Sequence, residues 1–333
     1  MTRSLRVTIP LAIITALTLV VTACQTVPPP PRTVGSSNAR GTLPASAGTY
    51  FGTFALPTGG PVGEKATLAA EERFLGRKLD IAHWFYKWNG KFPSWREPYH
   101  ISQGRIPMIS WGGTDTRSIV NGSQDGLIRA RADGVRNLRR PVLMRWFWEM
   151  DGNTNRYKAG DPATFKAAWK RIVTIFRSRG ASNAAFVWCP NAWGFDIKRA
   201  QQMYPEPNTV DWICADAYNW YPKKRGSTWT SFEQNFRSWY AWGASKGKPL
   251  MIGEVGAQED PRSAGRKAQW IRDMGTTLRY RMPKVRAVLY FDHRTTSYSE
   301  PGTYYDWRLK SSASAHSAWR NMGLSRFFRP LHR

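Results

Sequence analysis

The chain has 333 residues, 41% of them hydrophobic, which is enough for one large domain with a substantial core. Lys and Arg number 49 against 23 Asp and Glu, a formal net charge of +26. These cations are spread along the chain, for example at Arg129, Arg131, Arg136, Arg139 and Arg140. No helix-turn-helix, zinc-finger or RNA-binding pattern accompanies them. They therefore predict a surface that works near anionic material rather than a specific nucleic-acid site.

The amino terminus is predicted to direct export of the chain. Two arginines among the first six residues precede an apolar run at 7–21, which is shorter than the roughly 18 residues of a membrane span. The sequence Val-Thr-Ala-Cys at 21–24 resembles the lipobox of bacterial lipoproteins, which implies removal of residues 1–23 and lipidation of Cys24. We therefore expect a lipid anchor on the outer face of the bacterial cell membrane. An ordinary secreted protein cleaved after Ala23 is the alternative.

Residues 24–47 are predicted to form a tether between this anchor and a folded domain. The four prolines from Pro28 to Pro31 make a stiff, extended stretch, and the Gly-Ser-Ser-Asn run at 35–38 is flexible. Such a segment cannot bury a core. We expect one folded domain over residues 48–325 and a basic tail over residues 326–333.

Eight short apolar runs follow from residue 48 onward. They are rich in Val, Ile, Phe, Trp and Tyr and are nearly continuously apolar, as expected for parallel strands buried on both faces. The predicted strands are 49–55, 79–88, 106–111, 141–150, 184–190, 210–218, 249–255 and 285–292.

Amphipathic segments with helix signals separate these strands. Asp161 and Pro162 are predicted to start one helix, apolar residues recur at helical spacing from Phe165 to Phe176, and Gly180 ends it. Alternating strands and helices imply a parallel sheet. Eight repeats in about 280 residues predict an α/β fold with one domain, the (β/α)8 or TIM barrel. No G-x-G-x-x-G or P-loop pattern follows any strand, which argues against a nucleotide-binding open sheet.

Two glutamates lie at the ends of predicted strands. Glu149 follows an aromatic run at the end of the fourth strand, and Glu254 lies between glycines at the end of the seventh. A TIM barrel builds its active site at the carboxyl ends of its strands. Because charged groups are rarely buried without partners, two carboxylates on this rim predict a paired site.

A carboxyl pair on one rim matches the chemistry of glycoside cleavage. One carboxylic acid protonates the leaving oxygen, and the other carboxylate attacks the anomeric carbon. The aromatic neighbours of Glu149 would raise the pKa of such an acid, and Tyr218, at the end of the sixth strand, is a candidate hydrogen-bond donor to the nucleophile. Taken singly, each glutamate also allows a structural role. Glu149 could partner Arg145 or a nearby helix N-terminus, and Glu254 could form a salt bridge with Arg or Lys on the rim.

At these positions the sequence resembles glycoside hydrolase family 26. Four family patterns occur in order within residues 80–293. They are Arg-Trp-Phe-Trp-Glu-Met-Asp-Gly at 145–152, where the family has Arg-x-x-His-Glu-Met-Asn-Gly, and then Trp-x-Pro-Asn at 188–191, Asp-x-Tyr at 216–218 and, after Lys-Pro, Glu-x-Gly at 254–256.

The resemblance implies a retaining hydrolase with Glu149 as acid/base, Glu254 as nucleophile and Tyr218 hydrogen-bonded to the nucleophile. The family consists mostly of endo-β-1,4-mannanases, with some β-1,3-xylanases and mixed-linkage glucanases. This sequence departs from the pattern in two places. Trp148 replaces the family's His before the acid/base, and the aromatic that follows Asn-Gly in the family is absent from 153–156. Both positions touch sugar near the cleavage point in the family, so the departures bear on mannan specificity.

Further residues near the strand ends are candidate substrate contacts. Some come from the family motifs and the others lie at the ends of the remaining strands: Trp148, Arg145, Asp216, Asn191, His83, Trp84, Trp111, Trp193, Trp220 and Asp292. For any single Trp, packing in the core is an equally good explanation.

The sequence predicts neither a metal site nor a cofactor, because no H-E-x-x-H or similar His pairing occurs. Cys189 and Cys214 lie in neighbouring predicted strands, where either a disulfide or two buried thiols would fit. The string Gly-Ala-Ser-Lys-Gly at 243–247 matches G-x-S-x-G, but a helix precedes it and a strand follows. A nucleophile elbow requires the reverse order, so we expect a helix end and loop rather than a serine hydrolase.

The leading hypothesis is a retaining, endo-β-mannanase-like hydrolase that acts as a monomer on a polysaccharide. The excess of cations favours an acidic glycan as substrate. The alternative is a non-catalytic glycan-binding lipoprotein on a degenerate barrel, motivated by the unusual residues around Glu149. A basic nucleic-acid binder, motivated by charge alone, is the third hypothesis.

Overall fold

Eight parallel strands close into a barrel in which each strand pairs with the next and the last pairs with the first. The computed structural model describes residues 48–55, 60–153, 155–297 and 301–329. The strands are β1 (Tyr50–Ala55), β2 (Ile81–Tyr86), β3 (Ile106–Trp111), β4 (Val142–Trp146), β5 (Ala184–Trp188), β6 (Trp212–Asn219), β7 (Leu250–Ala257) and β8 (Val285–Asp292). The predicted TIM barrel and its eight strands are therefore confirmed.

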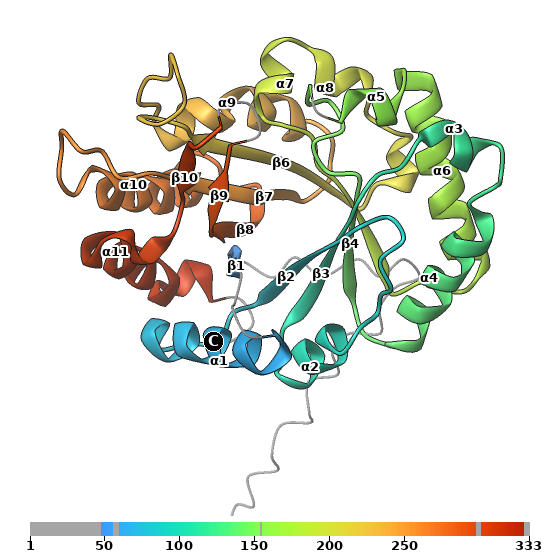
Figure 1. Cartoon of the computed structure of the whole chain (residues 1–333), viewed down its shortest axis with the longest axis horizontal. Coiled ribbons are helices and arrows are strands. Elements are labelled where there is room, and N and C mark those ends of the chain that lie inside the picture. Colours follow the sequence, from blue (N-terminus) through green and yellow to red (C-terminus); the bar gives the residue numbers. More distant parts are fainter. Residues whose placement is uncertain (1–47, 56–59, 154, 298–300, 330–333) are drawn as a thin grey trace, which may run out of the picture. The chain divides into compact units, whose positions relative to one another are not determined.

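Helices form an outer ring around the strands (Figure 1). They are α1 (Gly60–Leu75), α2 (Arg96–Ser102), α3 (Thr116–Val120), α4 (Asp125–Asn137), α5 (Arg156–Ala159), α6 (Pro162–Ser178), α7 (Trp193–Asp196), α8 (Arg199–Gln202), α9 (Phe232–Gly243), α10 (Arg266–Tyr280) and α11 (Ala313–Leu324). Short 3-10 turns occur at η1 (Pro207–Thr209), η2 (Leu309–Ser311) and η3 (Arg326–Phe328).

The helix ends follow the sequence signals. The Asp161 carboxylate caps α6 by accepting hydrogen bonds from the backbone amides of Ala163 and Thr164, with Pro162 in the first turn. Ser231 caps α9 in a reciprocal capping box with Gln234. The 243–247 string lies in the turn between α9 and β7, as predicted.

Two apolar layers hold the barrel together. A cluster of alternate strand residues fills the interior, including Tyr50, Ile81, Met108 and Leu143, all at most 2% exposed. The intervening strand residues face outward and pack against the helices in a second, larger cluster. Both layers follow from strand geometry, since successive side chains point to opposite faces.

The chain after β8 adds elements that the strand count did not predict. A short antiparallel hairpin of β9 (Arg294–Thr296) and β10 (Tyr304–Asp306) follows β8 and leads into η2. Residues 326–328, which the sequence analysis assigned to a basic tail, form η3, and Phe328 is buried against Phe51.

A bulge in β7 determines which way Glu254 points. Ala215 of β6 pairs with Ile252, but the next residue, Asp216, pairs with Glu254, so Gly253 is an extra residue. Because strand side chains alternate, one extra residue turns Glu254 to the barrel interior, where an unbulged strand would point it outward.

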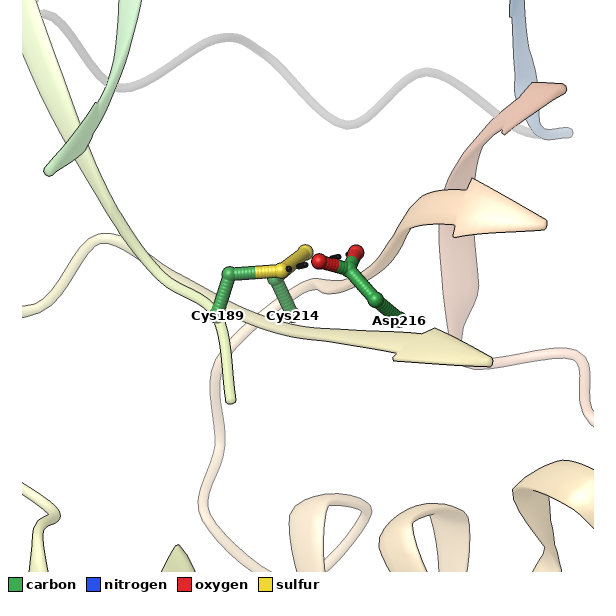
Figure 2. Close-up of side chains that lie close together, drawn as sticks. All are labelled: Cys189, Cys214 and Asp216. Atoms are coloured by element: carbon green, nitrogen blue, oxygen red, sulfur yellow. Dashed lines mark hydrogen bonds between the residues drawn. A yellow bond between two sulfur atoms is a disulfide. The ribbon is translucent and has the colours of Figure 1, made fainter. Parts of the chain in front are cut away.

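Gly253 can occupy the bulge because it has no side chain. Cys189 and Cys214 form a disulfide beside it, and Asp216 lies against the same sulfurs (Figure 2). A Cβ at position 253 would lie 2.6 Å from the Cys214 sulfur and 2.8 Å from Asp216 Oδ1.

The anchor predicted from the sequence, including Cys24, lies outside the described residues, so export and lipidation stay predictions. Within the described part of the chain, no helix is both long enough and apolar enough to cross a membrane.

We expect Gly253→Ala to lower the free energy of unfolding by about 1–3 kcal/mol, because the added methyl overpacks a rigid site. Gly126→Ala is the matched control, since a Cβ there meets nothing within 4 Å. That helical control should be neutral or slightly stabilising. Urea denaturation of both variants measures the difference, and equal stabilities would contradict the packing argument.

Candidate active site

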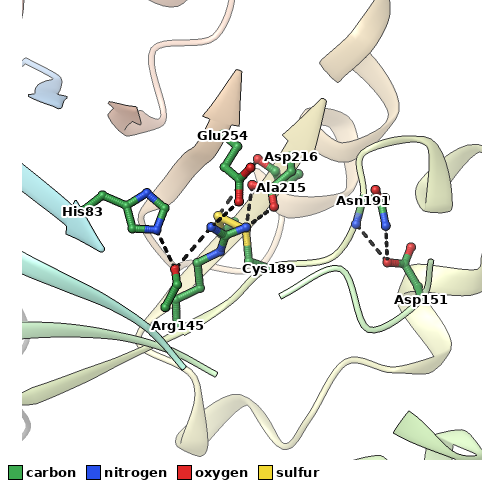
Figure 3. Close-up of a disulfide and its surroundings, with 10 residues drawn as sticks. His83, Arg145, Asp151, Cys189, Asn191, Ala215, Asp216 and Glu254 are labelled. Atoms are coloured by element: carbon green, nitrogen blue, oxygen red, sulfur yellow. Dashed lines mark hydrogen bonds and ion pairs between the residues drawn. A yellow bond between two sulfur atoms is a disulfide. The ribbon is translucent and has the colours of Figure 1, made fainter. Parts of the chain in front are cut away.

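A buried arginine stands at the centre of the site. Arg145 points inward from β4 and is 0% exposed. Its guanidinium forms an ion pair with Asp216, donates a 2.8 Å hydrogen bond to Glu254 Oε1, and approaches Ser110 Oγ at 3.4 Å (Figure 3). His83 shares a 2.6 Å hydrogen bond with the same Ser110 hydroxyl.

Arg145 remains charged in this environment. Burial alone would lower the pKa of its guanidinium, but the negative charges of Asp216 and Glu254 outweigh burial and raise the pKa above its ordinary value. His83 behaves in the opposite way, because burial and the Arg145 charge hold its pKa well below the ordinary value. The imidazole is therefore neutral at neutral pH, and Arg145 is the cation at this point of the barrel.

Glu254 accepts two strong hydrogen bonds. Arg145 contacts one carboxylate oxygen, and the Tyr218 hydroxyl donates to the other over 2.5 Å. Donors of this kind stabilise a charged carboxylate. Burial and the Glu254 charge raise the pKa of Tyr218 well above its ordinary value, so the phenol keeps the proton that it donates. Arg145 and Tyr218 therefore fix the position of the Glu254 carboxylate from two sides.

Glu149 has the opposite environment. No hydrogen-bond donor among the described residues contacts its carboxyl group. Burial raises the pKa of this carboxyl to about 8, the charge of Glu254 adds to the rise, and Arg145 opposes it. Glu149 is therefore mostly protonated at neutral pH, and the two carboxyl groups are close enough to influence each other's charge.

The main chain holds Glu149 in place. Phe147 and Glu149 have φ angles of +50° and +52°, a left-handed conformation that costs non-glycine residues about 1–3 kcal/mol each. The Glu149 amide donates to the Cys189 carbonyl over 2.8 Å, which joins this turn to the chain directly after β5. Asn155 Nδ2 donates to the Glu149 carbonyl over 3.3 Å. These backbone bonds stabilise the strained turn that carries Glu149.

Aromatic rings line both sides of the pair. Tyr218 packs against Trp220 and Trp307, with ring centroids 5.5 and 4.6 Å away. On the other side Trp148 packs edge-on against Phe85 at 5.0 Å. Apolar walls of this kind suit the C–H faces of sugars and keep water from the carboxyl groups.

A cleft of about 750 Å³ opens on the Glu149 side of the barrel mouth. Its walls come from the segments that follow β2, β3 and β4, and Trp148 and Asn155 belong to them. The full lining is Phe85, Tyr86, Lys87, Trp88, Asn89, Gly112, Gly113, Thr114, Phe147, Trp148, Asn155 and Lys158.

One cluster of described residues has the spacing of a metal site. The sulfurs of Cys189 and Cys214 and a carboxylate oxygen of Asp216 lie within 4.8 Å of one another. Both sulfurs are joined in the disulfide, and Asp216 is paired with Arg145. Metal sites require free thiolates, so this cluster is better described as structural support for the site.

Known proteins match this arrangement. Residues 81–235 match the model of Glycosyl hydrolase family 26. The chain is 32% identical over 283 residues to endoglucanase H of Acetivibrio thermocellus, which covers 80% of this chain and 30% of that protein. It is 26% identical over 159 residues to a beta-1,3-xylanase of a Vibrio species, which covers 46% of this chain and 31% of that protein.

These matches support glycoside hydrolase family 26. The chain spans only about 30% of the length of these two relatives. The solved structure of the GH26 beta-mannanase BoMan26A from Bacteroides ovatus superposes with a TM-score of 0.56 at 14% identity, covering 84% of this chain and 89% of that chain. That likeness establishes the shared fold.

The structure brings most of the residues expected from the family 26 motifs together. Arg145, Asp216, Tyr218 and Glu254 form one hydrogen-bonded group. His83 joins this group through Ser110, and Trp148 and Trp220 lie beside it. The salt bridge expected as the structural alternative for Glu254 does form, with Arg145 as its partner. No ion pair of Glu149 occurs among the described residues.

Two expected substrate contacts are wrong. Trp84 lies between the inward-facing His83 and Phe85, so it faces outward and stacks on Arg96 of α2, with the guanidinium carbon 3.7 Å from the ring centroid. Trp111 is 0% exposed and stacks on Trp88 at 4.3 Å. Strand alternation places both rings in the outer layer.

Three further candidates form no hydrogen bond with Glu149 or Glu254 among the described residues. The Asn191 side chain donates to Asp151 over 3.0 Å (Figure 3). Asp292 accepts a 2.6 Å hydrogen bond from the backbone of Leu309, and burial raises the pKa of its carboxyl to about 6. Trp193 remains 40% exposed on α7, where it contacts solvent and Arg199.

Sequence reasoning missed several residues of the site. Ser110 is a small polar residue in an apolar strand, and its spacing of two from the inward-facing Met108 was the available signal. Trp307 comes from the unpredicted segment after β10 and packs on Tyr218. Asn155 supports the Glu149 turn, but nothing in its sequence context indicated that contact.

Glu149 should titrate near pH 8, and its pKa should fall in Glu254→Gln because a negative neighbour is removed. The contribution of Glu149 to the free energy of unfolding, measured as the difference between wild type and Glu149→Gln, should decrease between pH 4.5 and about 8, since the folded chain keeps a proton that the unfolded chain loses. Carbon-13 NMR of the glutamate carboxyl groups measures the first effect and urea unfolding the second. A wild-type pKa near 4.5, or no change in Glu254→Gln, would contradict the assignment.

Proposed function

We propose that this chain is a retaining glycoside hydrolase that cleaves internal β-glycosidic bonds in a polysaccharide. The observation that carries the proposal is the contrast between two neighbouring carboxyl groups. Glu149 is without donors among the described residues and has a pKa of about 8, whereas Glu254 accepts hydrogen bonds from Arg145 and Tyr218. A pair whose environments favour opposite protonation states is suited to acid and nucleophile roles.

In the proposed double displacement, Glu254 attacks the anomeric carbon while Glu149 gives its proton to the leaving oxygen. A covalent glycosyl-enzyme results, and the first product departs. Glu149, now ionised, then takes a proton from water as the water attacks the same carbon and releases Glu254. Arg145 and Tyr218 orient Glu254, and Tyr218 keeps its own proton throughout.

For the substrate, we propose a range of sugars rather than a single one. The relatives are described as an endoglucanase, a beta-1,3-xylanase and a beta-mannanase. Trp148 lies beside both Glu149 and the cleft, so its ring would contact sugar next to the cleaved bond. A mannanase-like activity is the starting proposal, and β-glucans and β-1,3-xylan belong in the same substrate panel.

Glu254→Gln and Glu149→Gln should each lower kcat/KM by about a thousandfold or more, because each removes a group that acts on the reacting bond. Reducing-sugar release from glucomannan, mixed-linkage β-glucan and β-1,3-xylan measures this loss, with melting curves to verify folding. Glu233→Gln on α9 is the matched control and should remain active. Proton NMR of the first product should show retained configuration.

Substantial activity in either variant would overturn the assignment of that residue. Retention of the wild-type protein on the same glycans without any product would instead favour the non-catalytic binding protein.

Tyr218→Phe should lower kcat by roughly tenfold to a hundredfold, the range expected for losing one charge-assisted hydrogen bond. The aromatic packing against Trp220 and Trp307 survives this change, so KM and the melting temperature should change little. Steady-state kinetics on the best substrate of the panel provides the test. Unchanged kcat would mean that the contact with Glu254 does not serve the reaction.

A further inference from the structure

The cleft beside Glu149 contains two lysines that the proposed mechanism does not use. Lys87 directly follows β2, and Lys158 lies on α5, after β4. Both are exposed and both line the same cleft of about 750 Å³. None of the twelve lining residues is an Asp or Glu. The described cleft wall therefore carries positive charge without a compensating carboxylate.

Unlike several carboxylates near the barrel mouth, the ammonium groups of Lys87 and Lys158 have no ion-pair partner among the described residues. The rim carboxylates Asp115, Asp260 and Asp306 are each paired with a nearby arginine, at 3.1, 2.7 and 2.6 Å. In contrast, no side chain among the described residues forms an ion pair or hydrogen bond with Lys87 or Lys158. The Lys158 ammonium lies 5.4 Å from the ring of the exposed Tyr157.

Aromatic residues make up much of the rest of the cleft wall. Phe85, Trp88, Phe147 and Trp148 line it, together with the uncharged Asn89, Thr114 and Asn155. Gly113 lets the Phe147 ring pack closely against it, because a Cβ there would lie 2.3 Å from that ring. A ligand that fits this wall needs an apolar face for the rings and a negative group for the lysines. Low-dielectric walls also strengthen the attraction between the lysines and an anion.

We propose that the cleft is a subsite for an anionic sugar unit, one that carries a carboxylate or a sulfate ester. The proposal rests on the proposed function, because Phe147 and Trp148, which directly precede Glu149, line the cleft, and a sugar held there would lie near the cleaved bond. Glu149 does not repel such a unit, since its own carboxyl is mostly protonated at neutral pH.

The experiment compares neutral glycans with lightly carboxymethylated and lightly sulfated forms of the same glycans. For wild type, Lys87→Ala, Lys158→Ala and the double variant, kcat/KM is measured on each form, with melting curves to verify folding. The control is Lys170→Ala/Lys246→Ala, which removes two positive charges from exposed lysines on α6 and on the turn before β7, neither of which lines the cleft.

The ratio of kcat/KM on an anionic form to that on its neutral parent should exceed one in wild type. It should fall about threefold in each single variant and about tenfold in the double variant. The control should keep the wild-type ratio. Raising NaCl from about 50 to about 500 mM should reduce the wild-type ratio, because salt screens exposed charges. If the ratio exceeds one for only the carboxymethylated or only the sulfated glycan, the carboxylate or the sulfate ester respectively is the preferred group.

Equal ratios in wild type and the double variant, with glycans cleaved normally, would overturn the subsite while leaving the hydrolase proposal intact. If no glycan is cleaved, electrophoresis in gels containing the neutral or anionic polysaccharide decides the subsite separately. Retention on the anionic form that is lost in the double variant would support the subsite while the hydrolase proposal fails. Equal retention of the wild type and the double variant on the anionic form would overturn the subsite proposal.

Discussion

The charge of Arg145 is the constraint on which the rest of the site depends. A guanidinium with no exposure inside a barrel is tolerated only when negative partners surround it. Asp216 and Glu254 supply that charge, and Ser110 adds a polar contact. Arg145 thus joins strands β3, β4, β6 and β7, and its removal would leave the buried Asp216 and Glu254 carboxylates without their counterion. The position of the proposed nucleophile therefore depends on Arg145.

The two glutamates differ because they are held in different ways. Glu254 is held through its carboxylate by donors from two other strands, which favours the ionised form. Glu149 is held through its backbone, so its carboxyl stays free of donors among the described residues and becomes a weak acid. A single barrel mouth thereby provides an acid and a base from the same residue type, and the aromatic walls amplify the difference by excluding water.

Much of this structure could be predicted from the sequence. Continuous apolar runs separated by capped helices specified the barrel. Glu149, Glu254 and Tyr218 could be predicted from their places at strand ends, and Arg145 and Asp216 from the resemblance to the family 26 motifs. Strand alternation alone puts Trp84 and Trp111 in the outer layer. The bulge at Gly253 and the left-handed turn at Glu149 depend on contacts with β6 and on the Cys189 carbonyl after β5, distant in sequence, so local patterns carried no signal for them.

The backbone anchoring of Glu149 allows the position of its carboxyl group and the lining of the cleft to change independently. Because its amide is bound to the Cys189 carbonyl and its carbonyl to Asn155, the acid is positioned without help from the side chain at position 148. That neighbouring position is therefore open to replacement, and Trp148 occupies it here and faces the cleft. A barrel built this way can change the cleft wall by single substitutions at 148 while the two carboxyl groups stay where they are, which makes this position a natural starting point for directed evolution.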